Sequence, residues 1–435
     1  MPGSGLAVRR RRNARAKGRG RASGLTAWLP SSWFPESALV PLEGAAEVAC
    51  QYFLLMLRVM TPYWLSEQPL PISLVRVDDP EVAIVGAGIT GCTAALRLAQ
   101  AGKRVRLYDA REVAGGASGR NGGFALRGMP SRFDVTAAWV GEERARALMT
   151  WTEAALDTIE SLAGDAFRRV GSLRIVIDNE ELDEVTAEYD ALTAAGFDAE
   201  WVEASDLQPG GHFIGALRHV PDGVLQPARF VRRLAALAAE AGVEIRERSY
   251  VSSLDELGGA TAIICTDGYP SGLLGPIEGL IVPTRGQVIA TEPIPERLFE
   301  VPHYCRHGYD YWHQPEDGRI VAGGFRDVSL ETEFTVEEWP TDGVQQALRL
   351  FVNSLMGREL RVDYAWAGIF GIVMDLLPVV GRAPGLDNVW VAGGYSGHGN
   401  VLGFACGELV AHAVAGDDVP FLDVFDPSRL LNSDT

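Results

Sequence analysis

The stretch VAIVGAGITGCTAALRLAQAGKRVRLYD, residues 82–109, constrains the fold of this chain more than any other part of it. It begins with a short, continuously apolar and β-branched run, which is typical of a buried parallel strand. Gly86, Gly88 and Gly91 follow with G-x-G-x-x-G spacing, then an Ala/Leu-rich segment predicts a helix, and a second apolar run ends in Asp109. This order of strand, loop, helix, strand and acid predicts a dinucleotide site rather than an ordinary glycine-rich turn.

Each glycine and the acid have a mechanical reason in such a site. Gly86 permits the tight turn after the strand, Gly88 lets the backbone approach a pyrophosphate, and Gly91 lets helix and strand pack closely. The helix N-terminus offers unpaired N–H groups and a partial positive charge to phosphates. Asp109 can accept a hydrogen bond from a ribose hydroxyl.

Three features favour FAD over a nicotinamide dinucleotide. The second strand is followed by AREVAGGASGRNGGF, a second glycine-rich loop, where a nicotinamide enzyme normally continues into regular β–α units. No other predicted strand precedes a G-x-G-x-x-G pattern, so we expect no separate NAD(P)H domain. The C-terminal stretch LDNVWVAGGYSGHGNVLGFACGELVAHAVAG predicts a strand, a glycine turn and an apolar helix. Such a late strand can rejoin the first sheet and bring a second helix N-terminus to the far end of the cofactor.

From about Pro62 to its end, the chain resembles the FAD-dependent D-amino-acid-oxidase/glycine-oxidase/sarcosine-oxidase superfamily. The motifs GASGRNGGF, WAGIFGIVMDLLPVVGRAP and GGYSGHG carry the resemblance, which is strongest to the γ-glutamylputrescine-oxidase-like branch. The resemblance implies an α/β fold with a Rossmann-like FAD-binding domain of discontinuous segments. It also implies an α+β substrate domain with a mainly antiparallel sheet.

We expect the FAD-binding domain to comprise residues 60–130, 221–280 and 361–425, and the substrate domain to comprise residues 131–220 and 281–360. The resemblance also implies which residues contact FAD: Gly86, Gly88, Gly91, Asp109, Ser118, Gly119, Asn121, Gly122, Val251, Gly394, Tyr395, Gly397, His398 and Gly399. No cysteine stands where covalent attachment of the flavin is expected, because Cys406 lies inside an apolar helix. We therefore expect FAD to be bound non-covalently.

The segment VPHYCRHGYDYWHQPEDGRIVAGGFRD predicts two strands joined by a turn at residues 316–318. Aromatic and histidine side chains on a sheet beside a flavin suit an amine pocket, because a dry site disfavours the charged ammonium. The candidate catalytic residues are Tyr309, Tyr311, Arg326, Trp366 and His398. For each residue of the sheet taken alone, packing in the core is the simpler interpretation. For His398, a structural role in the turn has the same weight as a functional one.

The predicted function is oxidation of the C–N bond of an amine, including γ-glutamylated or other polyamine-type amines, to an imine that hydrolyses. Amino-acid oxidases of the superfamily often carry an arginine before a D-x-x-P-x-x-G turn, but AGIFGIVM, before Asp375, has none. Arg285, Arg306 or Arg326 could replace this carboxylate clamp, so an amino-acid or N-methyl amino-acid oxidase is a second hypothesis. A flavin-binding protein without turnover is a third.

Dioxygen and another oxidant, such as a quinone or a protein, are both open as electron acceptors. Some relatives place a lysine near the flavin to assist the reaction with dioxygen. The lysines of this chain are Lys17 and Lys103, and Lys103, just before the second strand, is expected to lie far from the flavin. A cation in that role would therefore be a histidine or an arginine, and His398 is a candidate by its position.

Composition and charge limit the partners and the cellular location that we expect for the protein. The formal net charge is -18, and basic residues gather in the first 25 positions, which argues against a nucleic-acid surface on the folded part. Scattered cysteines without metal-ligand spacing predict free thiols, no metal and a cytoplasmic location. Residues 1–59 are expected to be disordered or a spurious extension, with Met60 as the alternative start. An apolar run around Arg58 is too short to span a bilayer, so no transmembrane segment is expected.

Overall fold

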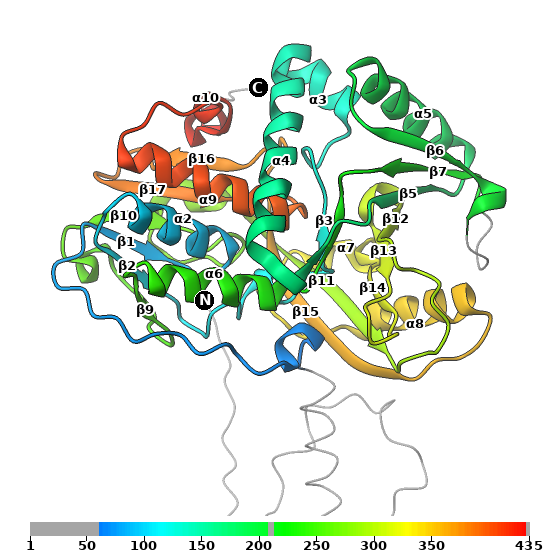
Figure 1. The fold of residues 1–435 in the computed structure, drawn as a ribbon, viewed down its shortest axis with the longest axis horizontal. Helices are drawn as coiled ribbons and strands as arrows, with labels where there is room; N and C mark the ends of the chain where they lie inside the picture. The colour runs from blue at the N-terminus through cyan, green and yellow to red at the C-terminus, as the bar shows by residue number, and fades with distance from the viewer. Residues whose placement is uncertain (1–60, 208–212, 432–435) are drawn as a thin grey trace, which may run out of the picture. The chain divides into compact units, whose positions relative to one another are not determined.

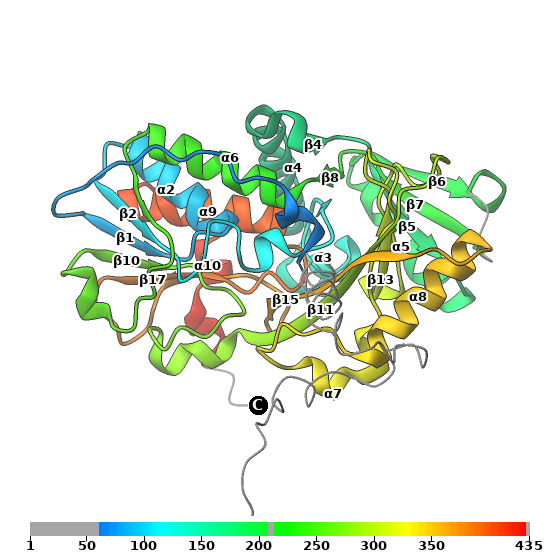
Figure 2. The ribbon, with the colours of Figure 1, turned by 90° about the horizontal axis from the view of Figure 1, so that it is seen from below.

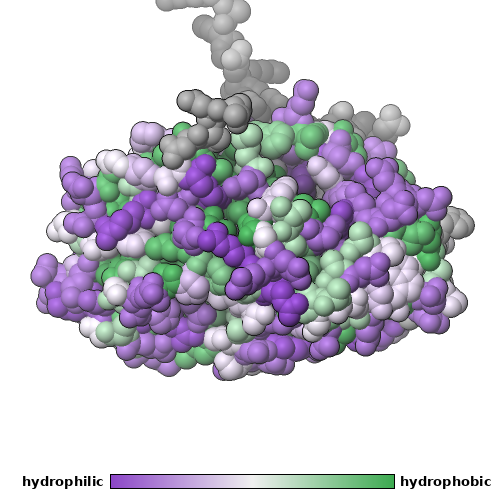
Figure 3. All heavy atoms as spheres, turned by 90° about the horizontal axis from the view of Figure 1, so that it is seen from above, coloured by the Kyte–Doolittle hydropathy of each residue, from purple (hydrophilic) through white to green (hydrophobic). Residues whose placement is uncertain are grey.

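The computed structural model describes residues 61–207 and 213–431. The predictions for residues 1–59, and for a start at Met60, lie outside the described residues. Within these described ranges, no helix is both long and apolar enough to cross a membrane. The face shown in Figure 3 is mainly polar, and its apolar side chains form small separate patches.

A six-stranded sheet carries the first glycine motif near its middle. In spatial order its strands are β16 (Val379–Arg382), β17 (Val389–Gly393), β10 (Thr261–Ile264), β1 (Val82–Val85), β2 (Val105–Tyr108) and β9 (Glu244–Arg246). All neighbouring strands are parallel except the β16–β17 pair. The carboxyl ends of the parallel strands therefore meet at one edge, which is where ligands bind in open α/β sheets.

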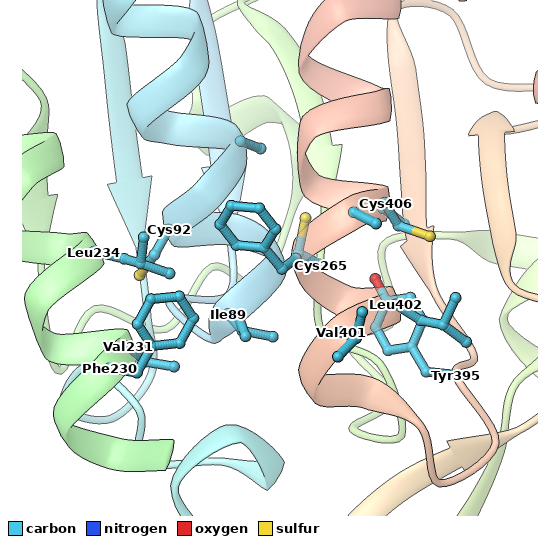
Figure 4. Close-up of a cluster of buried hydrophobic side chains, with 14 of the residues drawn as sticks. Ile89, Cys92, Phe230, Val231, Leu234, Cys265, Tyr395, Val401, Leu402 and Cys406 are labelled. Carbon is cyan, nitrogen blue, oxygen red and sulfur yellow. The ribbon is translucent and has the colours of Figure 1, made fainter. Parts of the chain in front are cut away.

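Three helices lie side by side on one face of this sheet: α2 (Ile89–Gln100), α6 (Pro227–Glu240) and α9 (Gly399–Ala415) (Figures 1 and 2). Figure 4 shows how Ile89 of α2, Phe230 of α6 and Leu402 of α9 gather in the core between them. Cys406 is fully buried in the same core, so its predicted packing role is confirmed. Burial of these apolar side chains from distant parts of the chain holds the parallel strands and their loops together.

An eight-stranded sheet forms the second large element. In spatial order its strands are β15 (Val362–Ile372), β11 (Val282–Thr291), β14 (Val321–Gly324), β13 (Asp310–His313), β12 (His303–Cys305), β5 (Ser172–Val176), β7 (Gly215–His219) and β6 (Ala199–Glu203). All its pairs are antiparallel except β12–β5. The predicted mixed fold, with a parallel sheet and a mainly antiparallel one, is confirmed.

The two faces of the eight-stranded sheet have different roles. Alternate residues point to opposite faces of a strand, and Trp312, Ile289 and Ala365 face a core that α8 (Asp342–Met356) covers. On the other face, Val176 and Leu217 pack in a core with α3 (Phe133–Val140), α4 (Glu142–Ala163) and α5 (Asn179–Ala194). Val288 and Trp366 lie on that second face, but they pack in the core that also contains residues of α2, α6 and α9.

The remaining elements are short. They are β3 (Phe124–Ala125), β8 (Gly223–Leu225) and β4 (Phe167–Arg168), which form a three-stranded sheet, and the helices α7 (Leu330–Glu333) and α10 (Leu422–Phe425). The 3-10 helices are η2 (Tyr63–Ser66), η3 (Ala117–Gly119), η4 (Gly164–Ala166), η5 (Ala204–Asp206), η6 (Leu254–Leu257), η7 (Gly275–Leu280), η8 (Arg306–Gly308), η9 (Arg326–Ser329) and η10 (Pro427–Leu430).

Two elements do not follow the predicted domain segments. β15, which lies within 361–425, pairs with β11 along its whole length and so belongs to the eight-stranded sheet. α4, which lies within 131–220, contributes Leu148, Leu156 and Ile159 to the core beneath α6 and α9. Both differences have the same cause. The hydrophobic pattern along the chain shows where a strand or a helix forms, but it does not show against which sheet or core that element packs. The other domain boundaries stay predictions.

Candidate active site

The first glycine loop lies between β1 and α2 at the carboxyl edge of the parallel strands. Gly86 has φ +108°, and a Cβ there would lie 2.5 Å from the carbonyl oxygen of Cys265 on the neighbouring strand end. A Cβ on Gly91 would lie 1.9 Å from the carbonyl oxygen of Gly86. The predicted roles of Gly86 in the turn and of Gly91 in close packing are therefore confirmed, whereas their contact with FAD stays a prediction.

The second glycine loop packs directly against the first. The amide of Ile89, at the start of α2, donates to Ser118 Oγ over 2.9 Å, and a Cβ on Gly88 would lie 2.8 Å from the same oxygen. The amides of Thr90 and Gly91 have no acceptor among the described residues. The N-terminus of α2 thus keeps free N–H donors, as an anion site requires.

Asp109, at the carboxyl end of β2, holds the loop from the side. Its carboxylate accepts from the amides of Ala87 and Arg111, each over 2.7 Å. Burial raises the pKa of Asp109, and these two backbone bonds act in the opposite direction. The acid therefore lies next to the first loop, where the predicted ribose contact requires it.

The C-terminal glycine turn meets the N-terminal loop, as the sequence predicts. The hydroxyls of Tyr395 and Thr90 are hydrogen-bonded over 2.8 Å. Asn400, in the first turn of α9, exchanges two side-chain hydrogen bonds with Asn121 over 3.1 and 3.0 Å, and also donates to Phe124 O. Segments that lie some 300 positions apart in the sequence thus enclose one site.

Asp267, which the sequence interpretation did not single out, also joins the distant segments. It lies three residues after the end of β10, and its carboxylate accepts from the amides of Gly394 and Gly371 over 2.7 and 3.0 Å. Burial raises its pKa, and the backbone donors oppose that change. Its place just after a buried strand, in TAIICTDGY, was the available signal, as it was for Asp109.

The other predicted cofactor residues differ in their surroundings. Gly394 and Gly397 have positive φ values, as the tight turn before α9 needs. A Cβ on Gly119 would lie 2.2 Å from Ala114 O. Val251 is buried in the core on the opposite face of the six-stranded sheet, in the connection between β9 and β10.

His398 precedes Gly399, the first residue of α9. Its Nδ1 is buried and has no hydrogen-bond partner among the described residues. Burial lowers its pKa to about 4, so the imidazole is uncharged at neutral pH. An uncharged imidazole with an unused ring nitrogen can exchange a hydrogen bond with a bound group.

Tyr311 stands where the eight-stranded sheet meets the second glycine loop. A Cβ on Gly122 would lie 2.6 Å from its ring, and a Cβ on Gly323 would lie 2.3 Å from its hydroxyl. Burial raises the pKa of Tyr311 to about 12, while Arg326 acts to lower it. The Arg326 guanidinium lies 4.1 Å from the centre of the Tyr309 ring. The structure therefore brings together Tyr309, Tyr311 and Arg326.

Trp366 is more deeply buried than a residue that lines a pocket would be. Its side chain is 1% exposed, and its indole N–H donates to Arg120 O over 2.8 Å. It supports the second glycine loop from the sheet. Its proposed role as a catalytic residue thus rests on its position in the sequence motif alone.

The three arginines considered as a carboxylate clamp have different partners. Arg285 binds the buried Glu333 through two bonds of 2.8 and 2.9 Å. Arg306 binds Asp310 over 2.6 and 2.7 Å and also contacts Asp327. Arg326 has no carboxylate partner among the described residues. It is thus the guanidinium of the three that is free to receive an anion.

A double-mutant cycle tests whether the two ends of the chain meet here. We expect Thr90→Val and Tyr395→Phe to show a coupling free energy of about 1 kcal/mol in urea unfolding of the FAD-loaded protein, because each removes one partner of the same hydrogen bond. Thr158→Val, on the exposed side of α4, combined with Tyr395→Phe is the control and should be additive. Additivity of the first pair would contradict the contact.

The arrangement fits FAD. The free amides at the start of α2 can hold the diphosphate, Asp109 lies beside them, and the turn before α9 together with the second glycine loop adjoins the sheet that would face the flavin. Among the described residues, a Cβ on Gly88 would meet only the Ser118 side chain within 4 Å. FAD is thus compatible with the donors and the close backbone approaches that this chain provides.

Comparison with known proteins agrees with this geometry. The family model described as FAD dependent oxidoreductase matches residues 81–413. The probable oxidoreductase OrdL of Haemophilus influenzae is 27% identical, over 79% of this chain and 85% of the relative. The gamma-glutamylputrescine oxidoreductase of Escherichia coli is also 27% identical, over 78% of this chain and 84% of its own length.

The fold is likewise that of a solved structure. Glycine oxidase from Geobacillus kaustophilus superposes with a TM-score of 0.65 and 22% identity, covering 80% of this chain and 98% of its own. The predicted resemblance, the oxidoreductase class and the cofactor FAD are confirmed by these matches. The chain therefore belongs to the D-amino-acid-oxidase family of FAD-dependent oxidoreductases.

Proposed function

We propose that the protein oxidises the C–N bond of an amine that carries an acidic group away from the reacting carbon. One observation carries this proposal: Arg326 lies beside Tyr309 and Tyr311 without a carboxylate partner among the described residues. The strand before Asp375 has no arginine at the place where amino-acid oxidases often hold an α-carboxylate. An anion held by Arg326 instead suits an acid group at another position of the substrate.

The chemistry that FAD supplies is acceptance of a hydride equivalent from the carbon bonded to the amine nitrogen. The protein's own groups bind and orient the substrate. Tyr309, Tyr311 and the guanidinium of Arg326 would position it against the second glycine loop. The first amides of α9 would stabilise negative charge at the flavin's pyrimidine end.

Burial favours the neutral amine that the reaction needs. The uncharged His398 offers a hydrogen bond without adding a positive charge that would repel an ammonium group. Water then hydrolyses the imine product to a carbonyl compound and ammonia or an amine. The name of the Escherichia coli relative, which refers to gamma-glutamylputrescine, supports an amine with an acidic conjugate as the substrate class.

Oxidation of an amino acid is the second candidate. The glycine oxidase relative from Bacillus licheniformis, 25% identical over 80% of this chain and 97% of its own length, supports it by its name. In that case Arg326 would bind the α-carboxylate, in place of the arginine that amino-acid oxidases often carry before the turn at Asp375. The distance between the acid and the reacting amine in the preferred substrate distinguishes the two candidates.

The experiment is anaerobic mixing of the FAD-loaded protein with a panel of amines, followed by admission of air. The panel contains α-amino acids, N-methyl amino acids, simple amines and amines with a remote carboxylate. We expect the remote-acid amines to bleach the flavin absorbance fastest. Fastest bleaching by α-amino acids would favour the second candidate, and no bleaching by any compound would favour a flavoprotein without turnover. Recovery of colour in air identifies dioxygen as an acceptor.

A further inference from the structure

A row of polar side chains continues from the candidate site across the eight-stranded sheet. Tyr311 of β13 pairs directly with Tyr304 of β12, and Tyr304 pairs directly with Arg174 of β5. Residues that pair directly point to the same face of a sheet. Two strand spacings separate the ends of this row, so Arg174 lies about 10 Å from Tyr311.

The far end of the row is a buried ion pair. Arg174 Nη1 donates to Glu188 Oε2 over 2.5 Å, and the two side chains are 6% and 8% exposed. The Tyr304 hydroxyl has no hydrogen-bond partner among the described residues, and burial raises its pKa, so it stays protonated. Glu188 and Arg174 also act on the pKa of His398, which Glu188 raises and Arg174 lowers, although burial has the largest effect.

A second histidine adds unused hydrogen-bonding capacity beside this pair. His219 of β7 pairs with Ser172, which lies two residues from Arg174 and therefore on the same face of β5. Its side chain is 5% exposed, and neither ring nitrogen has a partner among the described residues. Burial lowers its pKa to about 4, so it is uncharged and keeps one donor and one acceptor unused.

We propose that Tyr304, Arg174, Glu188 and His219 form a distal subsite that receives an uncharged polar group, an amide or a hydroxyl, at the far end of a long substrate. The charged side chains near these groups already have partners: Arg174 pairs with Glu188, Arg127 with Glu153, Glu184 with Arg132, and Asp222 accepts from Ser172. Tyr304 and His219 carry no charge. A charged ligand group would lose its hydration there without gaining a counter-charge. An amide can instead exchange hydrogen bonds with the free hydroxyl and with the edge of the ion pair.

This inference rests on the proposed function, because it assumes that Arg326 holds the acid of the same substrate. It adds a preferred substrate length and a second point at which the protein recognises the substrate. A long linear substrate would therefore be preferred over a small amino acid. Tyr304 and the ion pair are then residues that determine specificity, distinct from the groups around Tyr311.

The test uses non-reactive probes, so it does not depend on turnover. Monoamides of linear dicarboxylic acids, from glutaric to sebacic, are titrated into the FAD-loaded protein by isothermal calorimetry. Acids of the same lengths that end in an isopropyl group, which has the shape of the amide, are titrated in parallel. We expect one amide length to bind about tenfold more tightly than its isopropyl counterpart. The matching dicarboxylic acid, with a charged far end, should bind more weakly than the monoamide.

Two variants locate the preference. Tyr304→Phe should reduce the amide preference several-fold, and Tyr250→Phe, whose side chain is 64% exposed, should leave it unchanged. Equal binding of amides and isopropyl acids at every length would overturn the distal subsite while leaving the proposed function intact. Failure of every acid to bind would overturn the proposed role of Arg326 and the distal subsite together. A preference that survives Tyr304→Phe would show that the amide binds elsewhere.

Discussion

The Gly91→Ala variant should be purified with little or no FAD, and its affinity for added FAD should fall by at least about 100-fold. The added Cβ would lie 1.9 Å from the carbonyl oxygen of Gly86, a contact that can be relieved only by moving backbone. A shift of α2 away from the loop displaces the free amides of Thr90 and Gly91 from the diphosphate. Because anion binding at a helix N-terminus depends on the aim of these groups, a small displacement has a large effect.

Gly279→Ala is the matched control, because a Cβ at Gly279 would meet no atom within 4 Å. Its FAD content should equal that of the wild type. Circular dichroism of both variants separates loss of the cofactor from loss of the fold. Wild-type affinity for FAD in Gly91→Ala would mean that the glycine loop does not approach the cofactor.

The Arg326→Met variant should lower kcat/KM for the best acid-bearing amine by about 100-fold, mainly through KM. The guanidinium carbon of Arg326 lies 4.1 Å from the centre of the Tyr309 ring. Methionine keeps an unbranched apolar side chain at this position but removes the charged group. Loss of a charge-assisted, two-point contact to a carboxylate accounts for the size of the effect. The preference for acid-bearing over methyl-ended amines should disappear at the same time.

Arg382→Met is the control for this prediction. Arg382 also stacks on an aromatic ring, that of Trp390 at 4.8 Å, but it is exposed on β16, away from the glycine loops. The kinetic constants and the affinity for FAD should stay at wild-type values. An Arg326→Met enzyme that still selects acid-bearing amines would refute the proposed anion contact.

The parts of the site that follow from local backbone requirements could be predicted from the sequence. A strand, a glycine with positive φ and a small-residue helix belong to one short stretch, so the loop at Gly86 and Gly91 was evident. The turn before α9 was predicted for the same reason. Each of these features needs only its own neighbours along the chain.

Features that arise from contacts between distant segments were not predictable in the same way. Asn400 and Asp267 look like ordinary polar residues, and only the fold shows that they tie the C-terminal turn to Asn121 and Gly371. The sheet to which β15 belongs depends on its pairing partner, which periodicity along the chain does not specify. The ion pair between Arg285 and Glu333 likewise depends on the tertiary fold, because the two residues lie far apart in the sequence.

The loop after β1 and the turn before α9 are expected to hold a single FAD between them. A crystal structure of the protein with FAD bound tests this claim most directly. We expect the diphosphate within hydrogen-bond distance of the Thr90 and Gly91 amides, and the isoalloxazine ring between the 394–399 turn and Tyr311. A flavin bound away from either segment would contradict it.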